Sequence, residues 1–236
     1  MSARAPIGIF GGTFDPIHFG HLRLAQEAVE QCNLASVRFI PSGTPPHRAA
    51  PYASAQHRLN MVRLAIQGNE KFVLDEREIF RTDPCYTVDT LTAMRVDIDL
   101  NWGSQQPLCL LLGSDAFLLL HTWYEWEKLF SLAHIVVLHR PQNNAVEQDF
   151  STRIAQASSA LHRVYQERAS TSPVVLSAAP AGAILRVDIP ALEISSSTIR
   201  ARCADNKDIH YLLPDTVASY IHTHHLYHYA DYQEKN

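Results

Sequence analysis

The chain has no run of about 18 apolar residues, the length that a helix needs to cross a bilayer. Its opening segment, MSARAPIGIF, lacks the long apolar stretch of a secretory signal peptide, so we expect a cytoplasmic protein without a membrane partner. The formal net charge of −4 argues against a surface built mainly to bind nucleic acid. Four scattered cysteines without a CxxC pair indicate free thiols in a reducing compartment.

The two common phosphate-binding glycine motifs are also missing. The glycines near the N-terminus stand in GGTFDPIHFGH, residues 11–21, whose spacing fits neither G-x-G-x-x-G nor G-x-x-x-x-G-K-[ST]. A dinucleotide fingerprint and a P-loop are therefore disfavoured. H-E-x-x-H is absent, and no third ligand accompanies His18 and His21 at a telling spacing, so we expect no metal site here. The chain contains no internal repeat and no signal of its oligomeric state.

What the chain does contain is an alternation of short apolar runs and amphipathic stretches. The runs compatible with strands buried on both faces lie at residues 7–10, 37–40, 72–75, 108–112 and 135–138. Helical periodicity occurs at residues 21–32 and 55–66, and Ser54 is placed to cap the second of these helices. This spacing is typical of right-handed βαβ units, so the sequence predicts an α/β fold with a doubly wound parallel sheet.

Residues 142–182 depart from this pattern. They are polar and contain one amphipathic candidate helix, at 150–166. The remainder of the chain is too short for a second domain: a strand at 183–189, the segment ISSSTIRARC and a last helix at 215–225. We therefore expect one domain, residues 1–236, with a surface excursion at about 142–182.

The stretch GGTFDP comes directly after the first expected strand, and open parallel sheets bind ligands beyond the carboxyl ends of their strands. Gly11 and Gly12 would let the backbone approach a ligand, and a helix beginning near Gly20 would present its N-terminus to an anion. His18 and His21 can face one ligand, with Gly20 leaving room between them. Two imidazole donors suit a phosphoryl group whose charge grows in a transition state, although ordinary surface or capping histidines are the alternative.

Two motifs carry a family resemblance. GGTFDPIHFGH resembles the H-x-G-H signature of the nucleotidylyltransferase superfamily, and ISSSTIR, residues 194–200, resembles its second signature, I-S-S-T-x-I-R. Five segments between them stand in the order expected of the bacterial nicotinate-nucleotide adenylyltransferases: PSGTPPHR (41–48), YTVDTL (86–91), GSDAF (113–117), TWYEWEKL (122–129) and HRP (139–141). The likeness covers most of the chain and fails only in the expected excursion that follows Pro141. Arg48 stands where the family usually has lysine, which alters hydrogen-bond geometry, and Ser197 stands where it often has threonine.

The resemblance implies a Rossmann-like nucleotidylyltransferase domain that transfers an adenylyl group in NAD biosynthesis. In that reaction the 5′-phosphate of nicotinate mononucleotide attacks the α-phosphorus of ATP, giving nicotinate adenine dinucleotide and pyrophosphate. The attacking oxygen is already anionic, so the work left to the protein is to align two polyanions and to stabilise developing charge. Magnesium is expected to arrive with ATP, because the sequence shows no carboxylate cluster to hold it.

The resemblance also implies roles for individual residues. His18, His21 and Arg200 are the expected catalytic residues. The expected ATP site comprises Gly11, Gly12, Thr13, Phe14, Gly20, Gly113, Asp115, Ser195 and Ser196. The expected site for nicotinate mononucleotide comprises Asp15, His47, Arg48, Thr87, Trp123, Tyr124 and Arg140. Within it Trp123 stacks on the pyridine ring, while Thr87 and the amide of Tyr124 meet the carboxylate. Asp15 either orients the region of the first helix or caps a turn before Pro16.

Other features have plainer interpretations. Trp126 is expected to be a core aromatic. The histidine-rich segment 222–230 is expected to be a solvated tail rather than a metal site, because its histidines share no clean helical face. A phosphopantetheine adenylyltransferase has similar end motifs but usually has threonine where His18 stands. A non-catalytic nucleotide-binding regulator is the other alternative, although a regulator could discard His18, His21 and Arg200.

Overall fold

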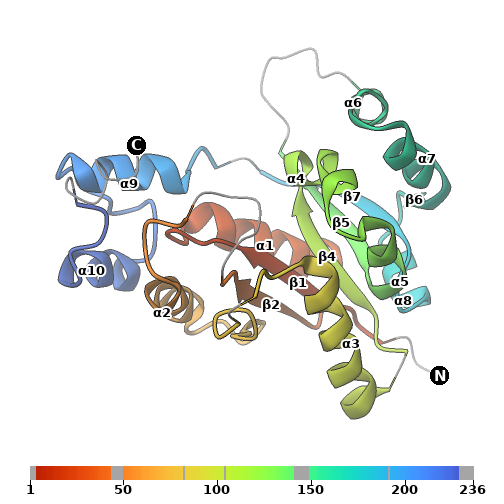
Figure 1. Ribbon diagram of the computed structural model, residues 1–236, viewed down its shortest axis with the longest axis horizontal. Coiled ribbons are helices and arrows are strands. Elements are labelled where there is room, and N and C mark those ends of the chain that lie inside the picture. The colour runs from red at the N-terminus through yellow and green to blue at the C-terminus, as the bar shows by residue number, and fades with distance from the viewer. Residues whose placement is uncertain are drawn as a thin grey trace. The chain divides into compact units, whose positions relative to one another are not determined.

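The computed structural model describes residues 4–43, 50–81, 83–103, 105–140, 149–190 and 192–228. In this part of the chain one sheet has the strand order β3-β2-β1-β4-β5-β7-β6. Figure 1 labels all of these strands except β3. The strands of the sheet are β1 (Ile7–Gly12), β2 (Ser36–Pro41), β3 (Phe72–Leu74), β4 (Leu108–Gly113), β5 (His134–His139), β6 (Ala169–Ser170) and β7 (Ile184–Asp188). The pairs β1–β4, β4–β5, β5–β7 and β6–β7 are parallel. The order runs outward from β1 in both directions, except that β6 lies outside β7, and this is the doubly wound, Rossmann-like topology that the sequence predicted.

Helices connect the strands. They are α1 (Phe19–Gln31), α2 (Ala55–Ile66), α3 (Thr87–Trp102), α4 (Ser114–Leu118), α5 (Leu129–Leu132), α6 (Phe150–Ala157), α7 (Ser159–Arg168), α8 (Val175–Ala178), α9 (Ser196–Ala204) and α10 (Asp215–Thr223). Two short 3₁₀ turns, η1 (Leu120–Thr122) and η2 (Trp126–Lys128), precede α5. The Ser54 hydroxyl accepts from the His57 N–H at 3.3 Å, which confirms the predicted cap of α2. No helix of the described residues is long and apolar enough to cross a membrane.

The chain divides into two compact units. Unit 1 comprises Met1–Phe10, Glu27–Val37 and Tyr86–Ala191, and unit 2 comprises Gly11–Gln26, Arg38–Cys85 and Leu192–Asn236. The expected boundary of a single domain, residues 1–236, stays a prediction.

The core of unit 1 surrounds β4 and β5, whose apolar side chains are buried on both faces, as the sequence predicted. Arg95 of α3 joins the neighbouring loops, because its three guanidinium nitrogens each donate at 2.6 Å to a carbonyl, those of Leu132, Gln106 and Pro180. The His134 ring at the start of β5 is buried. Its Nε2 lies 2.8 Å from the Ala179 carbonyl, and its Nδ1 accepts from the Ala183 N–H at 3.0 Å.

The region after residue 148 differs from the expected single helix at 150–166. Two helices, α6 and α7, form instead, because Ser158 is extended (φ −163°) and its hydroxyl accepts from the Leu161 N–H to cap α7. The short strand β6, which the sequence analysis missed, pairs with β7 as the last strand of the sheet. Four side chains of the region are buried: Phe150, Ile154, Leu161 and Leu176. This part of the expected excursion therefore contributes to both sheet and core.

Two further expectations in the fold are corrected. Strand β3 is not buried on both faces, since it is an edge strand and its Val73 is 37% exposed. Trp126 is half-buried rather than a core residue, and it packs edge-on against Phe130 with ring centroids 6.2 Å apart.

Candidate active site

The loop between β1 and α1 carries the first motif in unit 2. Phe14 is buried there with a positive φ of 49°, and the peptide bond between Asp15 and Pro16 is cis. A Cβ on Gly12 would lie 2.9 Å from the Phe14 ring, so this position requires glycine. Gly11 has open space where a Cβ would stand, which leaves the backbone accessible to a ligand.

The two histidines of the motif stack on each other, with ring centroids 3.8 Å apart. His18 is 3% exposed, whereas His21 is half-buried. The His18 N–H donates to His21 Nδ1 at 3.3 Å, so a neutral His21 carries its proton on Nε2. Phe14 packs edge-on against the His21 ring at 5.1 Å. The His21 ring is thus held from two sides, with its protonated nitrogen on the side opposite the backbone contact.

The second motif meets the first. A Cβ on Gly20 would lie 2.9 Å from the His18 ring and 3.3 Å from the Ile194 carbonyl, so glycine permits this approach. The Ser196 hydroxyl donates to the Pro16 carbonyl at 2.9 Å, and Arg200 NH1 donates to the Asp15 carbonyl at 2.7 Å. Residues 180 and 185 positions apart in the sequence therefore lie together, as the pairing of two motifs predicted.

Helix α9 begins within the second motif. The exposed Ser195 hydroxyl accepts from the Thr198 N–H at 3.1 Å and so caps the helix. The Arg200 guanidinium lies over the Tyr52 ring, 4.4 Å from its centroid. Its buried Nε makes no hydrogen bond to the described residues. Part of the Arg200 side chain is thus engaged in holding the first motif.

Asp15 is a point of attachment for three donors. Its carboxylate accepts from the Tyr52 N–H at 2.7 Å, the Ala53 N–H at 3.1 Å and the Tyr227 hydroxyl at 2.7 Å. The residue is only 5% exposed. These contacts match the first alternative of the sequence analysis, in which Asp15 orients the region before α1.

In unit 1, aromatic side chains join two of the predicted segments. Helix α3 begins at Thr87, and no side chain caps it. The Tyr86 ring before it packs against the Tyr124 ring, with centroids 4.8 Å apart. Trp123 is half-buried and Tyr124 is exposed, between the turns η1 and η2. Thr87 and the loop of Trp123 and Tyr124 are therefore neighbours.

Two more predicted segments end adjacent strands of unit 1. Gly113 closes β4 opposite Leu138 of β5, and a Cβ on Gly113 would meet nothing within 4 Å. The Ser114 hydroxyl lies 3.0 Å from His139 Nδ1. Asp115 is exposed and lies 3.7 Å from Arg153 NH2. Arg140, which comes directly after β5, is also exposed.

Comparison with known proteins agrees with this arrangement. Residues 9–202 match the cytidylyltransferase-like family. A probable nicotinate-nucleotide adenylyltransferase of Dechloromonas aromatica is 45% identical over 94% of this chain and 97% of that protein. One of Methylococcus capsulatus is 43% identical over 94% of this chain and 99% of that protein. The chain belongs to the nicotinate-nucleotide adenylyltransferases.

A solved structure supports the fold of this adenylyltransferase. The Plasmodium falciparum nicotinic acid mononucleotide adenylyltransferase complexed with NaAD has a TM-score of 0.68. It is 20% identical and covers 95% of this chain and 98% of that chain. This likeness shows the fold, and the two bacterial relatives show a nucleotidyltransferase of NAD biosynthesis, as the sequence motifs predicted.

One supporting residue of the adenylyltransferase was missed by the sequence analysis. Arg58 of α2 is 1% exposed and donates to the carbonyls of Thr13 at 2.8 Å, Gly43 at 3.0 Å and Ala53 at 3.3 Å. Burial lowers its pKa, while the Asp15 carboxylate acts in the opposite direction. A cation on the apolar face of an expected helix, three residues before Met61, was the signal that could have revealed it.

Not every predicted residue of the enzyme can be placed. His47 and Arg48 lie outside the described residues. The segment expected to be a solvated tail is corrected in part: its histidines at 222, 224 and 225 are exposed, but Tyr227 is buried.

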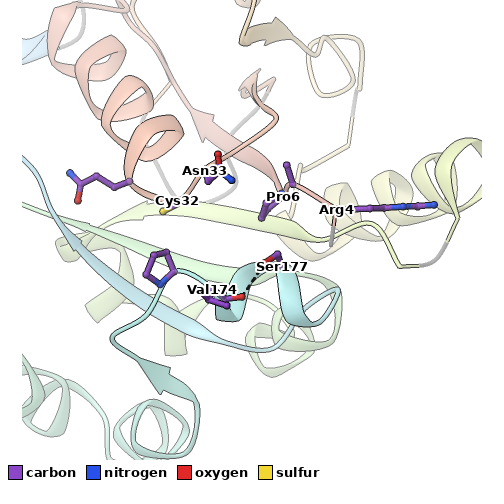
Figure 2. A pocket seen from close by; sticks show the side chains of 9 residues that line it. Arg4, Pro6, Cys32, Asn33, Val174 and Ser177 are labelled. Atoms are coloured by element: carbon purple, nitrogen blue, oxygen red, sulfur yellow. Dashed lines mark hydrogen bonds between the residues drawn. The ribbon is translucent and has the colours of Figure 1, made fainter. Parts of the chain in front are cut away.

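A cavity of about 230 Å³ in unit 1 is lined by residues that belong to none of the motifs (Figure 2). Its walls include Pro6 before β1, Asn33 after α1 and Ser177 of α8. It therefore adjoins the amino end of β1, whereas Gly113 and Arg140 mark the carboxyl ends of β4 and β5 in the same unit. We do not include it in the candidate site.

Proposed function

We propose that this adenylyltransferase joins ATP and nicotinate mononucleotide into nicotinate adenine dinucleotide and releases pyrophosphate. The observation that carries the proposal is the meeting of the two signature motifs around Gly20, where an added Cβ would lie 2.9 Å from the His18 ring and 3.3 Å from the Ile194 carbonyl. A chain that keeps two imidazoles, an arginine and a helix N-terminus together is suited to binding phosphates.

His21 would supply the donor that acts on the reacting phosphoryl group. Its Nδ1 is occupied by the His18 N–H at 3.3 Å, so Nε2 is the nitrogen that can donate to a phosphate oxygen. Negative charge grows on the phosphoryl oxygens and the leaving pyrophosphate during transfer, so a fixed donor there lowers the barrier. His18, stacked beneath, would keep the His21 ring in place.

The second motif would bind the departing phosphates. The N–H groups of the first turn of α9 lack partners within the helix, and the Ser195 cap leaves the helix end directed at an anion. The Arg200 guanidinium would add its positive charge to this field.

The pyridine end of nicotinate mononucleotide would be bound by residues of unit 1. The uncapped start of α3 presents the N–H groups of Thr87 and Val88, which have no partner within the helix and suit a carboxylate. Trp123 would stack on the ring. Gly113 and Asp115 would contact the adenosine part of ATP.

Magnesium would enter with ATP, held by phosphate oxygens and water. Among the described residues no group of three or more histidines, cysteines or acidic residues could hold a metal ion. Bound to ATP, the ion would reduce the negative charge that the incoming phosphate must approach. We also propose that the enzyme acts in the cytoplasm, where its four free cysteines would remain reduced.

The decisive experiment measures pyrophosphate release from ATP and magnesium with three phosphomonoesters as acceptors. Nicotinate mononucleotide should be used far better than nicotinamide mononucleotide, and phosphopantetheine should be inert. A preference for phosphopantetheine would replace the proposal with the related adenylyltransferase activity. Tight ATP binding without turnover of any acceptor would make the protein a regulator.

A further inference from the structure

Within unit 2, the segment after α10 places the Tyr227 side chain against Asp15 of the first motif. The Tyr227 side chain is 2% exposed, and its hydroxyl donates to Asp15 Oδ1 at 2.7 Å. The same hydroxyl lies 4.0 Å from the Met61 sulfur of α2. The backbone of Tyr227 has a φ of 63°, which costs a non-glycine residue energy and persists only where the surroundings hold it.

Tyr227 completes the set of donors around the Asp15 carboxylate. The other two are the adjacent N–H groups of Tyr52 and Ala53, which approach from the segment before α2. Unlike these two backbone donors, Tyr227 donates to the carboxylate from its side chain. Burial raises the pKa of Tyr227 well above its usual value, and the Asp15 charge adds to the effect, so the hydroxyl keeps its proton and donates.

Because the backbone of Asp15 and Pro16 is hydrogen-bonded to the second motif, the position of Asp15 affects both signature motifs. Its carbonyl accepts from Arg200 NH1 at 2.7 Å, and the next carbonyl, that of Pro16, accepts from the Ser196 hydroxyl at 2.9 Å. His18 stands three residues after Asp15. A movement of the Asp15 side chain would therefore shift the contacts that hold the two motifs together.

We propose that Tyr227 is a positioning residue for adenylyl transfer, which holds the Asp15 carboxylate so that His18, His21 and Arg200 keep their reactive arrangement. This inference rests on the proposed function of the site. Tyr227 itself touches no substrate in this scheme. Without its hydroxyl, the carboxylate would turn toward the buried Arg58, with which it already interacts electrostatically, and the loop would relax.

The test compares Tyr227→Phe with a matched control, Tyr220→Phe. The Tyr220 hydroxyl also belongs to the C-terminal part of unit 2 and is hydrogen-bonded to α2, to His57 and Asn60 at 2.9 Å each, without contact to Asp15. We expect Tyr227→Phe to lower kcat about tenfold, because small displacements of reacting groups are costly, with the KM values for both substrates nearly unchanged. Tyr220→Phe should keep the wild-type kcat even if its Tm falls as much.

Several outcomes overturn the inference. A wild-type kcat in Tyr227→Phe would contradict the positioning role but leave the proposed function standing. An equal loss of kcat in Tyr220→Phe would do the same. Wild-type enzyme that uses no acceptor of the panel overturns the proposed function together with the inference. If Tyr227→Phe does not fold, Asp15→Asn decides: a lowered kcat at unchanged KM supports the role of the carboxylate, and an unchanged kcat contradicts it.

A double variant tests the connection itself. Because Tyr227 is proposed to act through Asp15, Tyr227→Phe should change kcat much less in the Asp15→Asn background than in wild type. Equal effects in the two backgrounds would mean that Tyr227 acts by another route, contrary to the inference.

Discussion

His18 and His21 occupy different environments although three residues separate them. His18 is buried beneath the His21 ring, and His21 keeps one nitrogen directed away from the backbone. A substitution of His18 would therefore disturb packing as well as chemistry. His21 is the residue at which the chemical contribution can be measured with little disturbance of the fold.

His21→Ala should lower kcat about a hundredfold or more, because it removes a donor that stabilises charge in the transition state. The Tm should change little, since the side chain is half-buried at a loop–helix junction. Steady-state kinetics and thermal unfolding measure both quantities, with His222→Ala at an exposed position of α10 as control. An unchanged kcat with a raised KM would assign His21 to ground-state binding instead.

Arg200→Lys keeps the positive charge but replaces the planar guanidinium, with its several N–H donors, by a single ammonium group. The variant should lose about tenfold in kcat/KM for ATP, because an ammonium group cannot contact the Asp15 carbonyl, the Tyr52 face and a phosphate together. Titration of ATP at saturating acceptor tests this. Arg202→Lys is the control, because Arg202 belongs to the same helix and donates to the Asp208 carbonyl at 2.7 Å instead. Wild-type ATP dependence in Arg200→Lys would restrict Arg200 to its contacts within the chain.

Among the elements, the N-terminus of α3 determines the expected choice between acid and amide substrates. Its N–H groups and the Thr87 hydroxyl are mainly donors, and a carboxylate is only an acceptor. Nicotinamide would direct its NH₂ toward one of these donors and leave a buried polar group unpaired. That costs about 1–3 kcal/mol, which corresponds to a preference of roughly tenfold to a hundredfold for the acid.

Thr87→Val should reduce this preference, and Trp123→Ala should weaken both mononucleotides together, because stacking does not distinguish the two rings. The measurement is kcat/KM for each mononucleotide in each variant. Thr92→Val, at an exposed position five residues further along α3, is the control. Equal use of both mononucleotides by the wild-type enzyme would contradict the nicotinate preference.

For the whole molecule, stability should depend on pH through the buried His134. Burial lowers the pKa of this imidazole, and the nearby Arg95 charge lowers it further. The unfolded histidine titrates near pH 6.5, so below that pH the unfolded state binds a proton that the folded state does not. The contribution of His134 to the free energy of unfolding should therefore be fully present above about pH 6.5 and should decrease as the pH falls below it.

Urea unfolding of wild type and His134→Gln between about pH 8 and pH 5.5 tests this expectation. The glutamine amide can still accept from the Ala183 N–H and donate to the Ala179 carbonyl but does not titrate. The variant should lose less stability over this range than wild type. Parallel curves would show that His134 does not contribute, and His222→Gln should resemble wild type.

Local sequence patterns predicted much of the fold. The apolar runs placed the six longer strands within one or two residues at each end, because short apolar runs are typical of the strands of a parallel sheet covered by helices. The same patterns missed the two-residue strand β6, which carries no periodicity, and the extended Ser158 between α6 and α7. The site residues of both motifs could be named because each motif is continuous in the chain.

The sequence by itself determined the order of the elements, the two signature motifs and the chemistry to which their residue types are suited. Only the tertiary structure decided which distant groups meet. Tyr227 and Asp15 are 212 positions apart, and neither a periodicity nor a motif connects them. Likewise, the burial of Arg58 against three loop carbonyls depends on how α2 packs. Such contacts arise because buried polar groups must find partners, and the fold alone determines which partners are within reach.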